Sequence, residues 1–251
     1  MVVEIIKSTN YKYSMKSKFP KEVPHLTKEQ LSIKDDFYLF WLQKLRKSYG
    51  IVDHFNHNFV VKNSKKEFVS TLEIGSGIGE HLNYEKLTTQ QKNNYFALDN
   101  QKEILAQLSS EHPEINTILG DCQRKIDFKD NYFDRVIAIH VLEHLSNLPV
   151  TVSEISRILK KDGQLLVVIP CEGGLAYSLA REISAKRHFK KRYKMSYDWF
   201  IKSEHLNFPD EIIEELEKNF IVSKKSFFPL FVPLIFCNLC IGLVLKKKNF
   251  L

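Results

Sequence analysis

The stretch LEIGSGIGEHL, residues 72–82, ends a short apolar run with three alternating glycines. Gly75, Gly77 and Gly79 allow a sharp turn and a close approach to a ligand, because no Cβ stands in the way. The backbone N–H groups of the segment that follows can then point at that ligand. The stretch therefore predicts a strand followed by a ligand-binding turn.

More apolar runs follow at the spacing of alternating strands and helices. Strands are expected within 68–75, 94–99, 116–121, 133–140 and 164–170, with helices at 102–110 and 150–159 between them. Such alternation is typical of an α/β fold with a parallel, doubly wound sheet. After a helix at 209–219, two apolar stretches, 220–231 and 237–248, predict a terminal antiparallel pair of strands.

The flanking segments predict one main domain with two additions. We expect residues 1–67 to form a helical extension and residues 68–251 to form the main domain, with an insert at 171–208. In the extension, Thr27 and Gln30 have the spacing of a capping box, so a helix should run from 27 to 49 and end at Gly50. Residues 54–67 should then connect this helix to the first strand.

Composition and charge narrow the class of protein only a little. A chain of 251 residues with 43% apolar residues can build one sizeable core. The formal charge of +7 is compatible with nucleic acid, anionic lipid or a phosphorylated substrate. Cys237 and Cys240 form a lone CxxC, so we expect reduced thiols in the cytoplasm and no metal site. The first residues predict no signal peptide.

The apolar stretch 227–245 contains no charged residue and is followed by three lysines. Such a stretch can anchor a protein to a membrane. Pro229, Pro233 and Asn238 oppose a regular helix, so two buried strands are the preferred interpretation. Peripheral contact with a membrane is the alternative.

Acidic residues decide which ligand the glycine-rich turn fits. A dinucleotide site needs the pattern G-x-G-x-x-G, but Glu80 stands at the third glycine position. A carboxylate there would repel a pyrophosphate, whereas Glu73 before the turn would attract a cation. S-Adenosylmethionine carries an ammonium and a sulfonium and no phosphate, so it fits this turn better.

Two further carboxylates follow successive strands. Asp99 ends the second strand and can accept hydrogen bonds from a ribose diol. Asp121 follows the third strand, where it can accept from an adenine amino group while the Cys122 N–H donates to a ring nitrogen. Because ligands of open α/β sheets bind at these strand ends, the two acids predict an adenosine site.

Five segments together resemble the successive motifs of class I S-adenosylmethionine-dependent methyltransferases: LEIGSGIGEH, FALD, LGDC, DNYFDRVIAIHVLEHL and ISRILKKDGQLLVVIP. The resemblance covers about residues 68–170 and the terminal strand pair, and it implies a seven-stranded sheet with S-adenosylmethionine as cofactor. The sequence departs from the family pattern where Asn100 and Gln101 replace small apolar residues. The implied cofactor-binding residues are Glu73, Gly75, Gly77, Gly79, Asp99, Asn100, Asp121, Cys122 and His140.

The segment HVLEH, residues 140–144, follows the fourth strand and would border the transferable methyl group. It also matches H-x-x-E-H, a zinc-protease motif, but that motif needs a helix. Pro149 and its neighbours cut any helix here to little more than a turn, so the protease interpretation is rejected. A hydroxyl acceptor also needs a base, and the catalytic candidates are His140, Glu143 and His144.

The insert is basic and aromatic, and inserts after the fifth strand commonly cover the acceptor pocket in this fold. It would bind an anionic acceptor through charged and polar side chains; the candidates are Arg187, Lys190, Lys191, Arg192, Tyr193 and His205. A solvated helix face is the other interpretation. The insert and tail also resemble, more loosely, methyltransferases of bacterial surface-polysaccharide gene clusters.

Three classes of function stay open. We favour methyl transfer to oxygen of a small or carbohydrate-like acceptor, anionic and nucleotide- or lipid-linked. An RNA or protein methyltransferase is the second class, although the chain has no separate RNA-binding module. A non-catalytic domain that binds S-adenosylmethionine is the third. Neither the acceptor nor the oligomeric state follows from the sequence.

Overall fold

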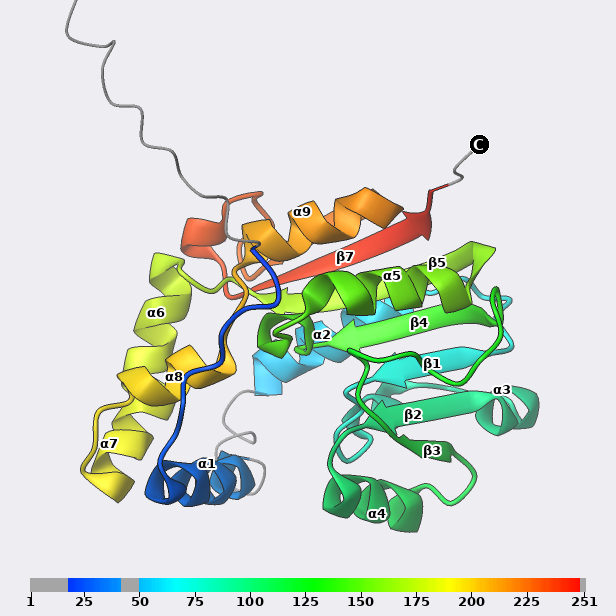
Figure 1. The fold of residues 1–251 in the computed structure, drawn as a ribbon. Coiled ribbons are helices and arrows are strands. Elements are labelled where there is room, and N and C mark those ends of the chain that lie inside the picture. Colours follow the sequence, from blue (N-terminus) through cyan, green and yellow to red (C-terminus); the bar gives the residue numbers. More distant parts are fainter. Residues whose placement is uncertain (1–17, 42–49, 249–251) are drawn as a thin grey trace, which may run out of the picture.

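A computed structural model describes residues 18–41 and 50–248. Seven strands form one sheet in the order β3-β2-β1-β4-β5-β7-β6 (Figure 1). Strands β1 to β5 are parallel, whereas β7 runs antiparallel to both β5 and β6. This order confirms the predicted doubly wound sheet with its terminal antiparallel pair. The bounds are β1 Thr71–Ile74, β2 Tyr95–Asp99, β3 Asn116–Leu119, β4 Phe133–Ile139, β5 Leu159–Pro170, β6 Phe220–Phe228 and β7 Cys240–Lys247.

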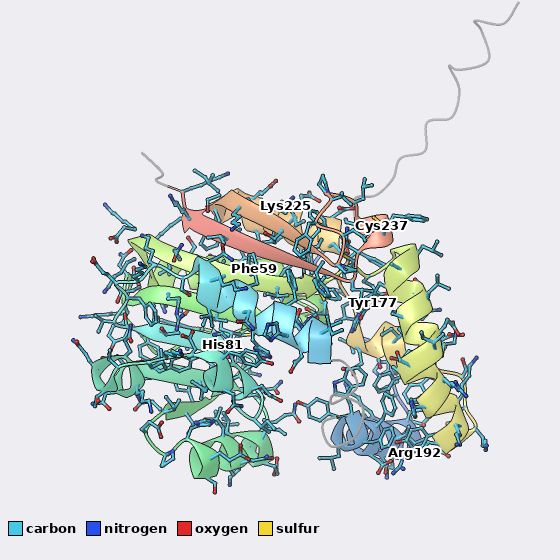
Figure 2. The ribbon with its side chains drawn as sticks, turned by 180° about the vertical axis from the view of Figure 1, so that it is seen from behind. Phe59, His81, Tyr177, Arg192, Lys225 and Cys237 are labelled. Atoms are coloured by element: carbon cyan, nitrogen blue, oxygen red, sulfur yellow. The ribbon has the colours of Figure 1, made fainter. Side chains whose placement is uncertain are left out.

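Helices cover both faces of this sheet. Helices α5 and α9 lie on the face seen in Figure 1, and α2 crosses the opposite face, seen in Figure 2. The helices are α1 Lys28–Phe40, α2 Gly50–Asn63, α3 Thr89–Asn93, α4 Lys102–Glu111, α5 Leu148–Ile158, α6 Leu175–Arg181, α7 Arg187–Tyr193, α8 Asp198–Glu204 and α9 Pro209–Asn219. Shorter turns are η3 Glu80–Tyr84, η4 Leu142–His144, the π-helical η5 Glu182–Lys186 and η6 Ile235–Cys237.

The central strands are apolar on both faces because both faces are covered. In β4, Val136 and Ala138 belong to the core under α5 and α9, while Ile137 packs with Phe59 of α2. All three β4 side chains are fully buried. Burial of a valine or isoleucine side chain stabilises the folded state by roughly 1.5–3 kcal/mol. This layer therefore supplies much of the driving force for folding.

Helix α2 corrects two predictions. Gly50 was expected to end a helix and 54–67 to be a connecting segment, but α2 begins at Gly50 and ends at Asn63. Its Asn, His and Val residues are weak helix formers, so packing must stabilise it. Phe59 lies so close to β7 that a Cβ on Gly242 would stand 2.6 Å from its ring. The glycine therefore lets α2 dock on the sheet.

The insert folds against the N-terminal extension. Phe37 of α1 makes edge contacts with Phe189 and Phe200, with ring centroids 5.1 and 5.2 Å apart. Helix α1 starts with the predicted capping box, in which Thr27 and Gln30 exchange hydrogen bonds. The rest of the predicted helix, with Leu42 and Leu45, lies outside the described residues. Helices α1, α6, α7 and α8 thus form a lobe beside the sheet (Figure 1).

The uncharged stretch 227–245 divides into a buried strand and an exposed loop. Strand β7 is buried from Cys240 to Leu245. The loop before it exposes large apolar side chains, with exposed fractions between 40% and 71%: Leu230, Phe231, Val232, Leu234 and Phe236. Across residues 18–41 and 50–248, no helix combines the length and apolarity that crossing a membrane would require.

Candidate active site

The predicted ligand-binding residues gather at one edge of the sheet, where the parallel strands end. The Gly75 N–H donates to the Leu98 carbonyl at 2.8 Å, and the Gly120 N–H donates to the Asp99 carbonyl at 3.0 Å. These bonds tie the segments after β1 and β3 to the end of β2. The glycine-rich turn, Asp99 and Asp121 are therefore neighbours, as the sequence predicted.

The glycine-rich turn has a backbone that only glycine adopts easily. Gly75 has φ +64°, and a Cβ there would lie 2.4 Å from Val141 Cγ2. Gly77 has φ +55°, and its N–H donates to Asp99 Oδ2 at 3.1 Å. The Ser76 hydroxyl is buried and has no partner among the described residues. The turn is thus a tight cradle with one unused buried polar atom.

Asp99 lies where a carboxylate that binds the ribose is expected, and hydrogen bonds hold its side chain in place. Its second oxygen, Oδ1, accepts from the Gln101 N–H at 3.0 Å, and the residue is buried. Asp121 is more accessible and accepts from the Gln123 N–H at 2.9 Å. Asn100 is exposed, whereas the Cys122 side chain is buried, which raises the pKa of its thiol to about 12.

Glu73 points into a buried polar layer. It is 3% exposed, and its Oε2 accepts from the Tyr95 hydroxyl at 2.7 Å. Burial raises the pKa of Glu73 to about 8, against the lowering by the Tyr95 hydrogen bond. The residue is therefore largely protonated at neutral pH, and its contact with an ammonium remains a prediction.

Beyond β4, His140 and Glu143 form a hydrogen-bonded pair. His140 has a left-handed backbone, φ +53°, which turns the chain into η4. Its Nδ1 lies 3.2 Å from Glu143 Oε1, and its Nε2 lies 2.9 Å from the Asn56 amide nitrogen. Because a carboxylate only accepts hydrogen bonds, the His140 Nδ1 donates to Glu143.

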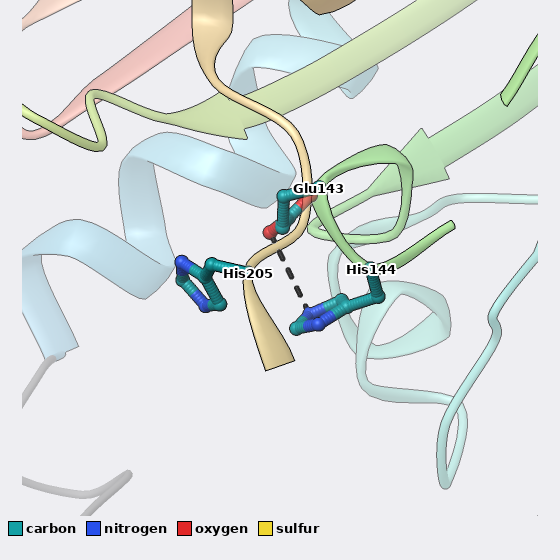
Figure 3. A group of neighbouring side chains, drawn as sticks. All are labelled: Glu143, His144 and His205. Atoms are coloured by element: carbon teal, nitrogen blue, oxygen red, sulfur yellow. Dashed lines mark ion pairs between the residues drawn. The ribbon is translucent and has the colours of Figure 1, made fainter. Parts of the chain in front are cut away.

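Glu143, His144 and His205 converge from η4 and from the end of the insert (Figure 3). The His144 Nε2 lies 3.8 Å from Glu143 Oε1, and the two imidazole rings are 5.1 Å apart. Glu143 is 1% exposed while the His144 side chain is 38% exposed. Burial would raise the pKa of Glu143, but the hydrogen bond from His140 and the neighbouring imidazoles lower it to about 2.

Each histidine of this group has one nitrogen committed. The His144 Nδ1 donates to the Glu204 carbonyl at 2.7 Å, and the His205 Nδ1 donates to Glu172 Oε2, also at 2.7 Å. Partial burial lowers the pKa of His144. A neutral ring with Nδ1–H leaves a lone pair on Nε2, so His144 can accept a proton.

The predicted basic ligands separate into two groups. Arg187, Lys190 and Lys191 are exposed on α7. Arg192 instead pairs with Asp36 of α1, with its Nε 2.9 Å from Oδ2, and the Tyr193 hydroxyl donates to the same carboxylate. The last two residues hold the insert to α1 in this structure, and their contact with an acceptor remains a prediction. Figure 2 shows Arg192 in this lobe.

Three residues of the site were missed by sequence reasoning. Asn56 was assigned to a connecting segment, although Val52, Phe55 and Phe59 around it have helical spacing. Glu172 directly follows β5, and a carboxylate at a strand end was a usable signal. Asn207 donates to the carbonyls of Leu142 and Leu145 at 2.8 and 2.7 Å and fixes η4, a long-range contact without any local motif.

Comparisons with known proteins agree with this geometry. Residues 72–167 match the family described as methyltransferase domain. The uncharacterised protein MJ0638 of Methanocaldococcus jannaschii is 35% identical over 106 residues, which is 42% of either chain. This match therefore spans less than half the length of that relative.

The fold agrees with three solved structures. A TehB-like S-adenosylmethionine-dependent methyltransferase of Corynebacterium glutamicum aligns with a TM-score of 0.56 at 13% identity, covering 87% of this chain and 100% of the other. A Thermotoga maritima S-adenosylmethionine-dependent methyltransferase gives 0.55 at 17%, covering 84% and 100%. The Haloferax volcanii partner of the Trm112 methyltransferase activator gives 0.60 at 14%, covering 85% and 98%.

Residues 72–167 thus match a methyltransferase domain, and the sheet that they build has the class I methyltransferase fold. This family and fold imply S-adenosylmethionine as the cofactor, and the residues present fit it. The turn leaves no room for a Cβ at Gly75, and its glycines would let a ligand approach the backbone closely. Asp99 would hold the ribose and Asp121 the adenine, and residues 140–144 would then lie on the acceptor side.

Proposed function

We propose that the protein transfers the methyl group of S-adenosylmethionine to a hydroxyl oxygen of a small or carbohydrate-like, anionic acceptor. The observation that carries this proposal is the accessible, neutral His144 beside the buried Glu143 carboxylate, just past β4. A neutral imidazole near a carboxylate can take a hydroxyl proton as a general base. The cofactor, when bound, supplies an already activated methyl group.

The chain then has to align the acceptor and accept its proton. The proton would pass to His144 Nε2, and the imidazolium would be stabilised by Glu143 at 3.8 Å. The Glu204 carbonyl holds the ring through Nδ1. Alignment of two bound reactants can supply up to about 7–11 kcal/mol of the barrier, and Asn207, by fixing η4, supports that alignment.

An anionic acceptor is supported by the exposed side of α7. Arg187, Lys190 and Lys191 face solvent and have no carboxylate partner within the described part of the chain. Charge-assisted hydrogen bonds from such groups recognise phosphate or carboxylate. A nucleotide- or lipid-linked sugar of a surface polysaccharide, handled in the cytoplasm, is the acceptor class that we favour.

Calorimetry with S-adenosylmethionine, followed by a methyl-release screen, tests the proposal. We expect micromolar binding and turnover on a sugar nucleotide or sugar phosphate. Turnover on RNA or protein instead would assign the chain to that other class of methyltransferase. Binding without turnover on any acceptor would favour a non-catalytic domain, and no binding would overturn the proposal.

Peripheral contact with a membrane would suit a lipid-linked acceptor. The exposed loop of Leu230 to Phe236 lies beside α6, because Gly174 approaches the Ile235 carbonyl so closely that a Cβ would be 2.5 Å away. Helix α6 and η5 add Leu175, Leu179 and Ile183 at intervals of four residues, all exposed. Co-sedimentation with anionic vesicles checks this contact, and F231S/F236S should abolish it.

A further inference from the structure

We propose that Glu143, His144 and His205 together bind one divalent transition-metal ion on the acceptor side of the domain. The inference deepens the proposed function and rests on it for its catalytic meaning. Each of the three residues offers a ligand atom within 4.8 Å of the other two. Figure 3 shows the three side chains as neighbours, Glu143 and His144 from η4 and His205 from the segment after α8.

The hydrogen bonds around the group prepare it for a cation. The His205 Nδ1 donates to Glu172, and the His144 Nδ1 donates to the Glu204 carbonyl. In protein metal sites, ligating histidines commonly donate their other N–H to a carboxylate or carbonyl, which fixes the tautomer and the ring orientation. Here both rings already have that arrangement.

The carboxylate also has an unused oxygen. Glu143 Oε1 accepts from His140, but Oε2 is buried and has no hydrogen-bond partner among the described residues. A buried, unpaired carboxylate oxygen is costly unless a charge or a donor satisfies it. A cation held by this carboxylate, whose Oε1 lies 3.8 Å from His144 Nε2, would compensate its buried charge.

The donor set indicates the class of metal. Two imidazoles and one carboxylate suit zinc, iron, cobalt or manganese better than magnesium or calcium, which prefer oxygen. Bond lengths of about 2.1 Å place tetrahedral ligands about 3.4 Å apart. Side-chain rotations that move each ligand atom by about 1 Å would bring the three atoms to that spacing.

Three protein ligands leave coordination positions open for an acceptor. A bound metal lowers the pKa of a coordinated water to about 7, and a coordinated hydroxyl would be acidified in the same way. The hydroxyl proton would go to solvent, and the oxygen would form its bond to the methyl carbon. The carbon–sulfur bond would break with its electron pair going to sulfur. In this arrangement His144 acts as a ligand instead of a base.

Cobalt(II) titration of chelator-treated full-length protein tests the site. We expect one ion per chain, with visible absorption of a nitrogen and oxygen site and without a sulfur charge-transfer band. H205A and E143Q should weaken binding by at least about 100-fold, and E172Q, which removes a positioning carboxylate, by about 10- to 100-fold. H188A, an exposed histidine of the same insert, and C237S are matched controls that should bind as the unmodified protein does.

Absence of cobalt binding, or binding that survives both H205A and E143Q, would overturn the site. A sulfur band that disappears in C237S would assign the ion to the cysteines and would also overturn it. Calorimetry with S-adenosylmethionine on the same samples separates the two proposals. Metal binding without cofactor binding would leave the metal site standing and remove the proposed function. Turnover at full rate in metal-free protein would leave the proposed function standing and overturn the catalytic role of the metal.

Discussion

The two halves of the sheet edge are built in different ways. On the cofactor half, each functional residue lies directly at or after the end of β1, β2 or β3, and the turn and Asp99 are joined by the bond from Gly77. On the acceptor half, the residues come from α2, η4, the end of β5 and the end of the insert. Local motifs therefore define the first half, whereas only tertiary packing assembles the second.

A variant on the acceptor half should give the largest loss of turnover. H144A removes the proposed base, or a metal ligand, and general base catalysis typically contributes about 10²–10⁴-fold. We expect kcat to fall about 100- to 1,000-fold on the acceptor found by the screen, with unchanged affinity for S-adenosylmethionine. An equal loss of cofactor affinity in calorimetry would break the division between the halves.

A variant on the cofactor half should have the opposite profile. D99A removes a carboxylate that accepts from Gly77 and is expected to accept from the ribose diol, and bonds to charged groups contribute about 1.5–3 kcal/mol each. Affinity for S-adenosylmethionine should therefore fall about 100-fold in calorimetry. D162A is the control, because Asp162 lies near the start of β5, away from the sheet edge where the parallel strands end. Unchanged affinity in D99A would refute the ribose assignment.

Glu73, in the buried layer behind the glycine-rich turn, should make the stability of the fold depend on pH. Glu73 has a pKa of about 8 in the fold, above its value near 4.3 in the unfolded chain. Between these values the folded state holds the extra proton, so the free energy of unfolding falls as pH rises. Between pH 6 and pH 8.5, the titration of Glu73 should lower the free energy of unfolding by roughly 2–3 kcal/mol.

E73Q keeps a neutral acceptor for the Tyr95 hydroxyl and should remove this slope. Urea unfolding at the two pH values measures it, and the variant should be the more stable protein at pH 8.5. A slope that is the same in E73Q and the unmodified protein would show that Glu73 titrates normally.

The smallest effect is expected on the exposed face of α7. The double charge reversal K190E/K191E should raise the KM of an anionic acceptor several-fold and leave cofactor affinity unchanged, because both lysines are exposed. K225E/K246E on the exposed side of β6 and β7 makes the same charge change away from the site. Equal effects of the two double variants on KM would show general electrostatics instead of a binding face.

The contrast also explains what the sequence could and could not predict. Short apolar runs, the glycine-rich turn and the acids at strand ends are local, so the parallel sheet with its terminal antiparallel pair, and the gathering of these residues at one sheet edge, followed from them. Helix α2 did not, because its weak helix formers depend on the groove that Gly242 opens for Phe59. Nor did the contact of Asp36 with Arg192, which joins residues 156 positions apart. Only the folded chain brings His205 to His144.

The aromatic contact of Phe37 with the insert has a consequence for motion. Because α1 and α7 share the cluster of Phe37, Phe189 and Phe200, neither can leave the other without exposing aromatic surface. Their amide protons should therefore exchange with solvent as one cooperative unit, distinct from the strands. Since His205 follows α8 of the same lobe, the acceptor half would lose a ligand whenever that unit opens. Acceptor access and assembly of the site would then be controlled by one local equilibrium.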